Sequence, residues 1–67
     1  MSASRDRAVA ARAKLDAAIG LLREVRGEVS VYATPGVKHQ ALTSADAALV
    51  AAGKTLAHLD NLIKRLL

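Results

Sequence analysis

Apolar residues recur at alternating steps of three and four residues through both halves of this 67-residue chain. The first series is Ala8, Ala11, Leu15, Ala18, Leu22, Val25, Val29 and Tyr32, and the second is Leu42, Ala45, Leu49, Ala52, Leu56, Leu59, Ile63 and Leu66. Such steps place apolar side chains along one side of a helix, as in the seam of a coiled coil. The two series therefore predict two long helices that meet along these seams.

The segment between the two series interrupts the helical pattern. Residues 29–34 are rich in β-branched side chains, which lower helix propensity, and Pro35 disfavours the α conformation at the residue before it. Thr34 is suited to cap a helix that has Pro35 at its first position, whereas Thr43 offers an alternative start. We expect one domain over residues 1–67, with helix one at about 4–32, a turn at 33–36 and helix two at 37–67, and with the conformation of residues 35–43 left open.

A short turn makes the two helices antiparallel neighbours. This arrangement sets Leu15 near Leu56, Leu22 near Leu49 and Val29 near Leu42. Fifteen residues are Ala and one is aromatic, so the hairpin has little side-chain volume to bury. A chain of this length buries only about 60% of its unfolded surface and often needs a partner. The sequence therefore predicts an all-α antiparallel hairpin that completes a helical bundle by self-association or by docking.

A second set of residues beyond the seams is a candidate partner interface. These residues widen the apolar stripe toward the face of a bundle helix or stand beside it: Ile19, Leu21, Ala48, Gly53, Leu62 and Tyr32. Two roles are open for Tyr32, which either closes the hairpin by packing on Leu42 or Val37 or anchors a partner. Glycines at positions 20, 27 and 53 allow either close approach of a neighbouring helix or a plain surface position.

The charged residues give the chain a net charge of +4 and gather its cations at one end of the hairpin. Folding the chain back brings together Arg5, Arg7, Arg12, Lys14, Lys64 and Arg65. This cluster is a candidate anion or nucleic-acid patch. The alternative is a solvated surface with local pairs at i,i+4, such as Arg12 with Asp16 and Asp60 with Lys64. No aromatic platform or nucleic-acid-binding motif accompanies the cluster.

Residues with catalytic or metal-binding chemistry are sparse and scattered. His39 and His58 are the only histidines, the chain has no Cys, and no phosphate-binding or nucleophile motif is present. The longest uncharged runs fall far short of the roughly 20 residues of a membrane span. We therefore expect no catalytic residue, cofactor, metal, small-molecule substrate or membrane span. We expect a non-enzymatic structural or assembly protein of the cytoplasm, or of an assembly built there, and the alternative is a small dimeric nucleic-acid-binding regulator.

Overall fold

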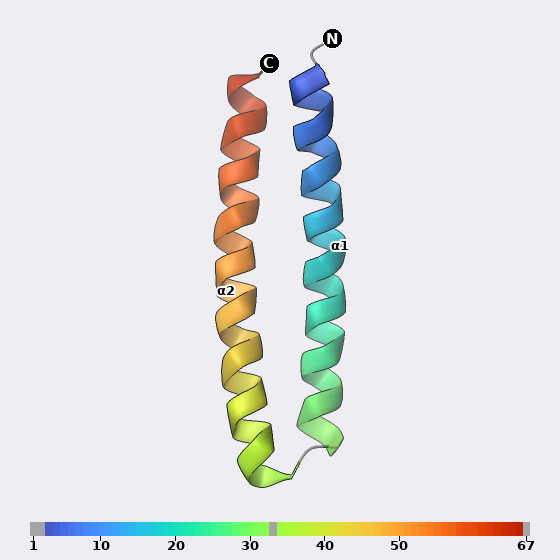
Figure 1. The fold of residues 1–67 in the computed structure, drawn as a ribbon, viewed down its shortest axis with the longest axis vertical. Helices are drawn as coiled ribbons and strands as arrows, with labels where there is room; N and C mark the ends of the chain where they lie inside the picture. Colours follow the sequence, from blue (N-terminus) through green and yellow to red (C-terminus); the bar gives the residue numbers. More distant parts are fainter. Residues whose placement is uncertain (1–2, 33, 67) are drawn as a thin grey trace.

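The computed structural model describes residues 3–32 and 34–66, and these form a hairpin of two helices. Helix α1 spans Ala3–Tyr32 and helix α2 spans Pro35–Arg65. They lie side by side and antiparallel, with both ends of the chain at the end opposite the turn (Figure 1). Residues 33 and 67, which were expected in the turn and in helix two, lie outside the described residues.

Helix α2 begins at Pro35, so residues 35–43 are helical. Thr34 precedes the helix with extended backbone angles (φ −65°, ψ 154°), and its carbonyl accepts a hydrogen bond of 2.7 Å from the Lys38 amide. Its side chain makes no capping hydrogen bond. The Thr43 hydroxyl donates to the His39 carbonyl at 2.8 Å, a back-bond typical of a threonine inside a helix. Proline at the first position, where its missing N–H is not needed, thus sets the start of α2.

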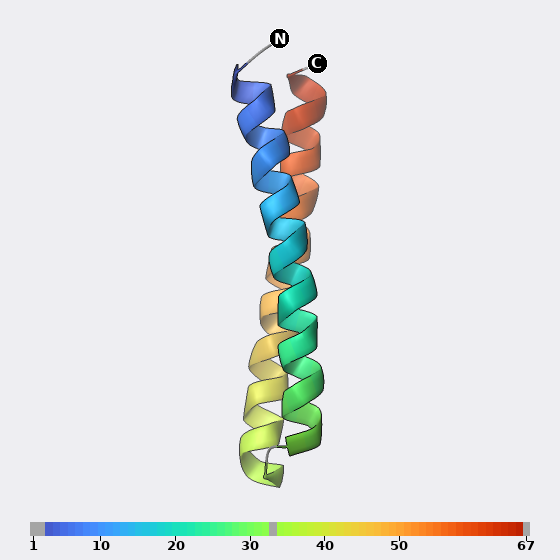
Figure 2. The same cartoon turned by 90° about the vertical axis from the view of Figure 1, so that its right-hand side faces the viewer.

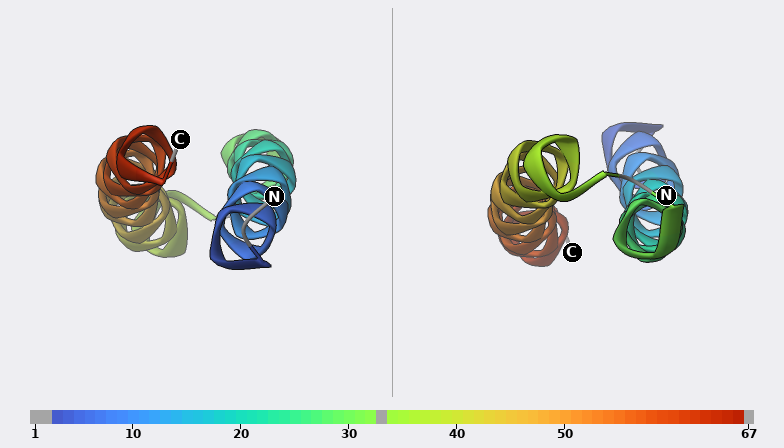
Figure 3. Two further views of the ribbon diagram at one scale, coloured as in Figure 1. Left: turned by 90° about the horizontal axis from the view of Figure 1, so that it is seen from above. Right: turned by 90° about the horizontal axis from the view of Figure 1, so that it is seen from below.

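The hairpin is a single layer. Its extents are 51 × 15 × 10 Å, and its radius of gyration is 15.4 Å, against about 11 Å for a globular domain of this length. Seen from the side and from either end, the two helices run the full length together with nothing covering either broad face (Figures 2 and 3). Globular domains bury their apolar faces between two or more layers. Among the described residues, only Ala8 and Ile19 are buried.

On α2, the residues turned toward α1 follow the expected apolar series. Every member of that series is partly buried, including Leu66, which directly follows the helix: Leu42, Ala45, Leu49, Ala52, Leu56, Leu59, Ile63 and Leu66. Leucine or isoleucine stands at six of these eight positions. Burial of this row against α1 is the main hydrophobic contribution that α2 makes to the hairpin.

On α1, the facing side is rotated by about 50°, half of one residue step, from the expected series. The positions with reduced exposure are Arg5, Ala8, Arg12, Leu15, Ile19, Leu22, Arg26, Val29 and Ser30. Val25 is 50% exposed, so its assignment to the seam is wrong, and Ile19 is 7% exposed, so its assignment to a free partner interface is wrong. The rotation buries the large Ile19 in place of Ala18 and brings two arginines within reach of aspartates on α2.

Candidate interaction surfaces

Two Arg–Asp ion pairs join the helices and define their register. Arg12 Nε donates to Asp60 Oδ1. Arg26 Nε donates to Asp46 Oδ1 at 2.5 Å, and its Nη2 lies 3.4 Å from Oδ2, so this pair has the two-point geometry of a guanidinium and a carboxylate. The arginines are two heptads apart on α1, and the aspartates are two heptads apart on α2. The helices therefore keep one register between the two pairs.

The hydrogen bond to Asp60 raises the pKa of Arg12, with smaller contributions from the charges of Asp60 and Asp16. The hydrogen bond to Asp46 and its charge raise the pKa of Arg26 in the same way. A raised pKa means that the stabilisation is fully present below the ordinary pKa of an arginine and is lost only as pH rises through the raised pKa. Both guanidiniums thus stay charged at any physiological pH, and salt is the variable that weakens the pairs.

Reversing one member of a pair tests this register. We expect Asp46→Arg to lower the melting temperature, because it sets two guanidiniums against each other, and Arg26→Asp with Asp46→Arg to recover most of the loss. The measurement is thermal unfolding followed by circular dichroism, at low and at 0.5 M salt, where the difference should shrink. A double variant no better than the single one would contradict this pairing.

The ion pairs mark one broad side of the hairpin, here called the paired face. On α2, the residues that follow the facing positions Ala45, Ala52 and Leu59 are Asp46, Gly53 and Asp60. In two antiparallel right-handed helices, residues that follow the facing row lie on the same side of both helices. The α1 residues on this side are Val9, Asp16, Arg23 and Ser30. The paired face is therefore charged along its length, and Gly53 belongs to it.

The opposite broad side carries no charged residue in its two central rows and is here called the uncharged face. It consists of the residues that precede the facing row on each helix: Ala11, Ala18 and Val25 on α1, and Ala41, Ala48, Thr55 and Leu62 on α2. Val25 and Leu62 are 50% and 44% exposed, and the exposed Leu21 stands at the edge of this face. The uncharged face thus leaves two large apolar side chains, Val25 and Leu62, open to solvent on one side of the hairpin.

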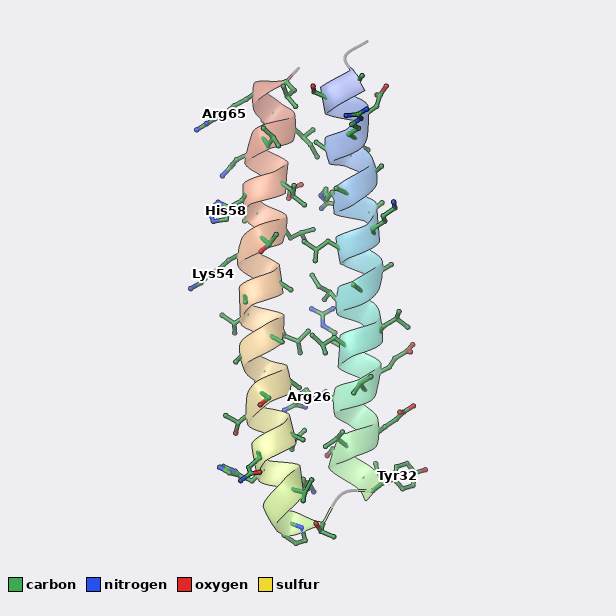
Figure 4. The ribbon with its side chains drawn as sticks, in the orientation of Figure 1. Arg26, Tyr32, Lys54, His58 and Arg65 are labelled. Atoms are coloured by element: carbon green, nitrogen blue, oxygen red, sulfur yellow. The ribbon has the colours of Figure 1, made fainter. Side chains whose placement is uncertain are left out.

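Tyr32 does not close the hairpin. Its side chain is 84% exposed and points away from α2 (Figure 4). The expectation that it packs on Leu42 or Val37 is therefore wrong. The side chain stands at the turn end, one heptad after Val25, where it extends the α1 row of the uncharged face beyond its central residues.

One residue of the candidate anion or nucleic-acid patch takes part in an ion pair between the two helices. Arg12 pairs with Asp60 on the neighbouring helix, whereas a local pair with Asp16 was the expected alternative. Arg65 points away from α1, as do Lys54 and His58 further along α2 (Figure 4). The side chain of Arg65 is therefore not directed toward the cations that α1 carries at this end.

Within residues 3–32 and 34–66, no cavity and no cluster of three metal-ligating side chains occurs. Neither described helix has a stretch apolar enough to cross a bilayer. No protein-family model, no curated protein and no solved structure matches this chain.

Proposed function

We propose that the chain is a non-enzymatic assembly module, a coiled-coil hairpin that completes a four-helix bundle through its uncharged face. The single observation that carries the proposal is the asymmetry between the two broad sides. Charged residues line the paired face, whereas the seven residues of the uncharged face include none. Faces of this kind are covered when helices of a bundle pack together.

The exposed surface supports the same proposal. The chain exposes 5030 Å², whereas a folded globular chain of 7.0 kDa exposes about 4,000 Å². The excess is close to the roughly 800 Å² per partner that a stable protein–protein interface removes. Covering the uncharged face would therefore bring the hairpin to the exposure of an ordinary folded protein.

Two valines on opposite sides of α1 provide the test. Val25 lies on the uncharged face and is 50% exposed, and Val9 lies on the paired face and is 44% exposed. We expect Val25→Asp to weaken assembly at least tenfold, because it buries a charge in the interface, and Val9→Asp to leave it nearly unchanged. The measurement is sedimentation equilibrium from 1 to 200 μM, with helicity checked by circular dichroism.

Thermal unfolding gives a second readout of the same proposal. A fold that is stabilised by association should melt at a temperature that rises with protein concentration. We expect this rise for the wild type and for Val9→Asp, and a smaller one for Val25→Asp. Equal effects of the two substitutions on mass and on melting would overturn the proposal.

The alternative function is binding of nucleic acid at the end of the hairpin opposite the turn, here called the open end. Its support is that Arg5, Arg7, Lys14, Lys64 and Arg65 all lie in the parts of α1 and α2 that are farthest from the turn. Such binding would weaken steeply with added salt and would be lost when Arg5, Arg7 and Lys14 are replaced together. An affinity for duplex DNA or RNA that does not respond to salt would remove this alternative.

A further inference from the structure

We infer that the uncharged face is covered by a second copy of this chain, turned end for end about a two-fold axis perpendicular to the helices. The inference rests on the proposed function and adds the identity and the orientation of the partner. In this arrangement, α1 packs on α1 of the second copy and α2 on α2, each pair antiparallel. The open end of one hairpin lies over the turn end of the other.

One other symmetric arrangement brings the same faces together. A two-fold axis parallel to the helices sets the open ends side by side, and α1 then packs on α2 of the second copy. The packing of the two central rows of the uncharged face is compatible with both arrangements. End for end, Ala11 falls opposite Val25 of the second copy and Ala48 opposite its Leu62; with open ends together, Ala11 falls opposite Leu62 and Val25 opposite Ala48. Each arrangement thus sets a small residue against a large one.

The row of α1 at the edge of the uncharged face distinguishes them. It consists of Arg7, Lys14, Leu21 and Glu28, one heptad apart from each other. Antiparallel packing of two such rows places Arg7 opposite Glu28 of the second copy and Lys14 opposite Leu21, and symmetry repeats both contacts. Opposite charges therefore meet at both ends of the outer edge of the α1 pair.

The arrangement with open ends together sets like charges against each other. The Arg12–Asp60 pair places α1 and α2 in a register where Arg7 lies level with Arg65 and Lys14 lies level with His58. With open ends together, Arg7 would therefore stand beside Arg65 of the second copy. The open end carries six basic residues and three acidic ones, whereas the turn end carries three basic and three acidic residues. End-for-end packing separates the two cationic ends.

Charge reversal at the edge gives opposite results for the two arrangements. We expect Arg7→Glu to weaken dimerisation about tenfold, because it meets Glu28 of the second copy, and Arg7→Glu with Glu28→Arg to restore it. With open ends together, Arg7→Glu would instead tighten the dimer by removing the repulsion from Arg65. Arg65→Glu is the matched control, with little effect expected end for end and tightening in the other arrangement. The dissociation constants come from sedimentation equilibrium at low salt.

A cysteine on the uncharged face locates the two-fold axis. The chain has no native cysteine, and Ala18 lies near the middle of its row. We expect Ala18→Cys to form a disulfide-linked dimer on mild oxidation, and Ala17→Cys, one residue away on the outer side of α1, to form none. If Arg7→Glu lowers the dissociation constant of the dimer and Ala18→Cys gives no cross-link, the end-for-end orientation is wrong, while the assembly function stands. A folded monomer at 200 μM would exclude a second copy as the partner, and whether a different helical protein binds in a Val25-dependent manner would then decide the proposed function.

Discussion

Replacing Ile19 by Asp is expected to abolish the folded hairpin. Ile19 is the only large side chain buried among the described residues, at 7% exposure, and it lies midway between the two ion pairs. Truncating a buried isoleucine to alanine costs about 2–5 kcal/mol, and a carboxylate in its place adds the cost of burying an unpaired charge. A hairpin this small has no comparable reserve of stability. The variant should show random-coil circular dichroism at concentrations where the wild type is helical.

A graded series separates loss of packing from general damage. Ile19→Val should lower stability by about 1 kcal/mol and Ile19→Ala by more, in proportion to the volume removed. Val50→Asp, at an exposed position on the outer side of α2, is the control and should fold. All variants are compared at one protein concentration by urea unfolding, because association contributes to stability. If Ile19→Asp folds as well as Val50→Asp, the facing side of α1 is not the one described.

The sequence pattern predicts α2 well because only one of its sides is apolar at every heptad. Helix α1 offers two overlapping patterns that share Ala8, Leu15, Leu22 and Val29. One adds Ala11, Ala18 and Val25, and the other adds Arg12, Ile19 and Arg26. Counting apolar residues favours the first, which is why Val25 was expected in the seam and Ile19 outside it.

The second pattern packs because an arginine can lie beside a seam and remain solvated. Its aliphatic stem covers apolar surface while its guanidinium reaches a carboxylate at the edge. The sequence does contain this signal, since the two-heptad spacing of Arg12 and Arg26 matches that of Asp46 and Asp60 in the opposite direction. Pairing these arginines with these aspartates across an assumed turn would have predicted the register of the two helices and the side of α1 that faces α2.

The candidate surfaces were less predictable than the fold. Whether a residue is available to a partner depends on the rotation of the whole helix, and exchanging one residue of each facing pair for its neighbour turns α1 by about 50°. This rotation takes Ile19 out of the candidate partner surface and leaves Val25 open on the uncharged face. Tyr32 is the last member of the periodic series of α1, but it lies at the end of the helix, just before the turn to α2, and its ring is exposed there.

Replacing Gly20, Gly27 and Gly53 together by alanine is expected to stabilise the hairpin substantially. All three lie inside helices, none has a positive φ, and a Cβ added at any of them meets nothing within 4 Å. Alanine is favoured over glycine in a helix interior by about 0.5–1 kcal/mol. Three additive gains of this size amount to about 2 kcal/mol, and for a domain of this length they raise the melting temperature by about 10 °C.

The same variant tests which side of the hairpin receives the partner. Gly53 lies on the paired face, and Gly20 and Gly27 lie on the outer part of α1 on that side, so none belongs to the uncharged face. Packing through the uncharged face should therefore keep the dissociation constant within about twofold while the melting temperature rises. Close approach of a partner helix over the glycines would instead be blocked by the added methyl groups. A triple variant that folds more stably but no longer associates would place the partner on the paired face and contradict an interface built on Val25 and Leu62.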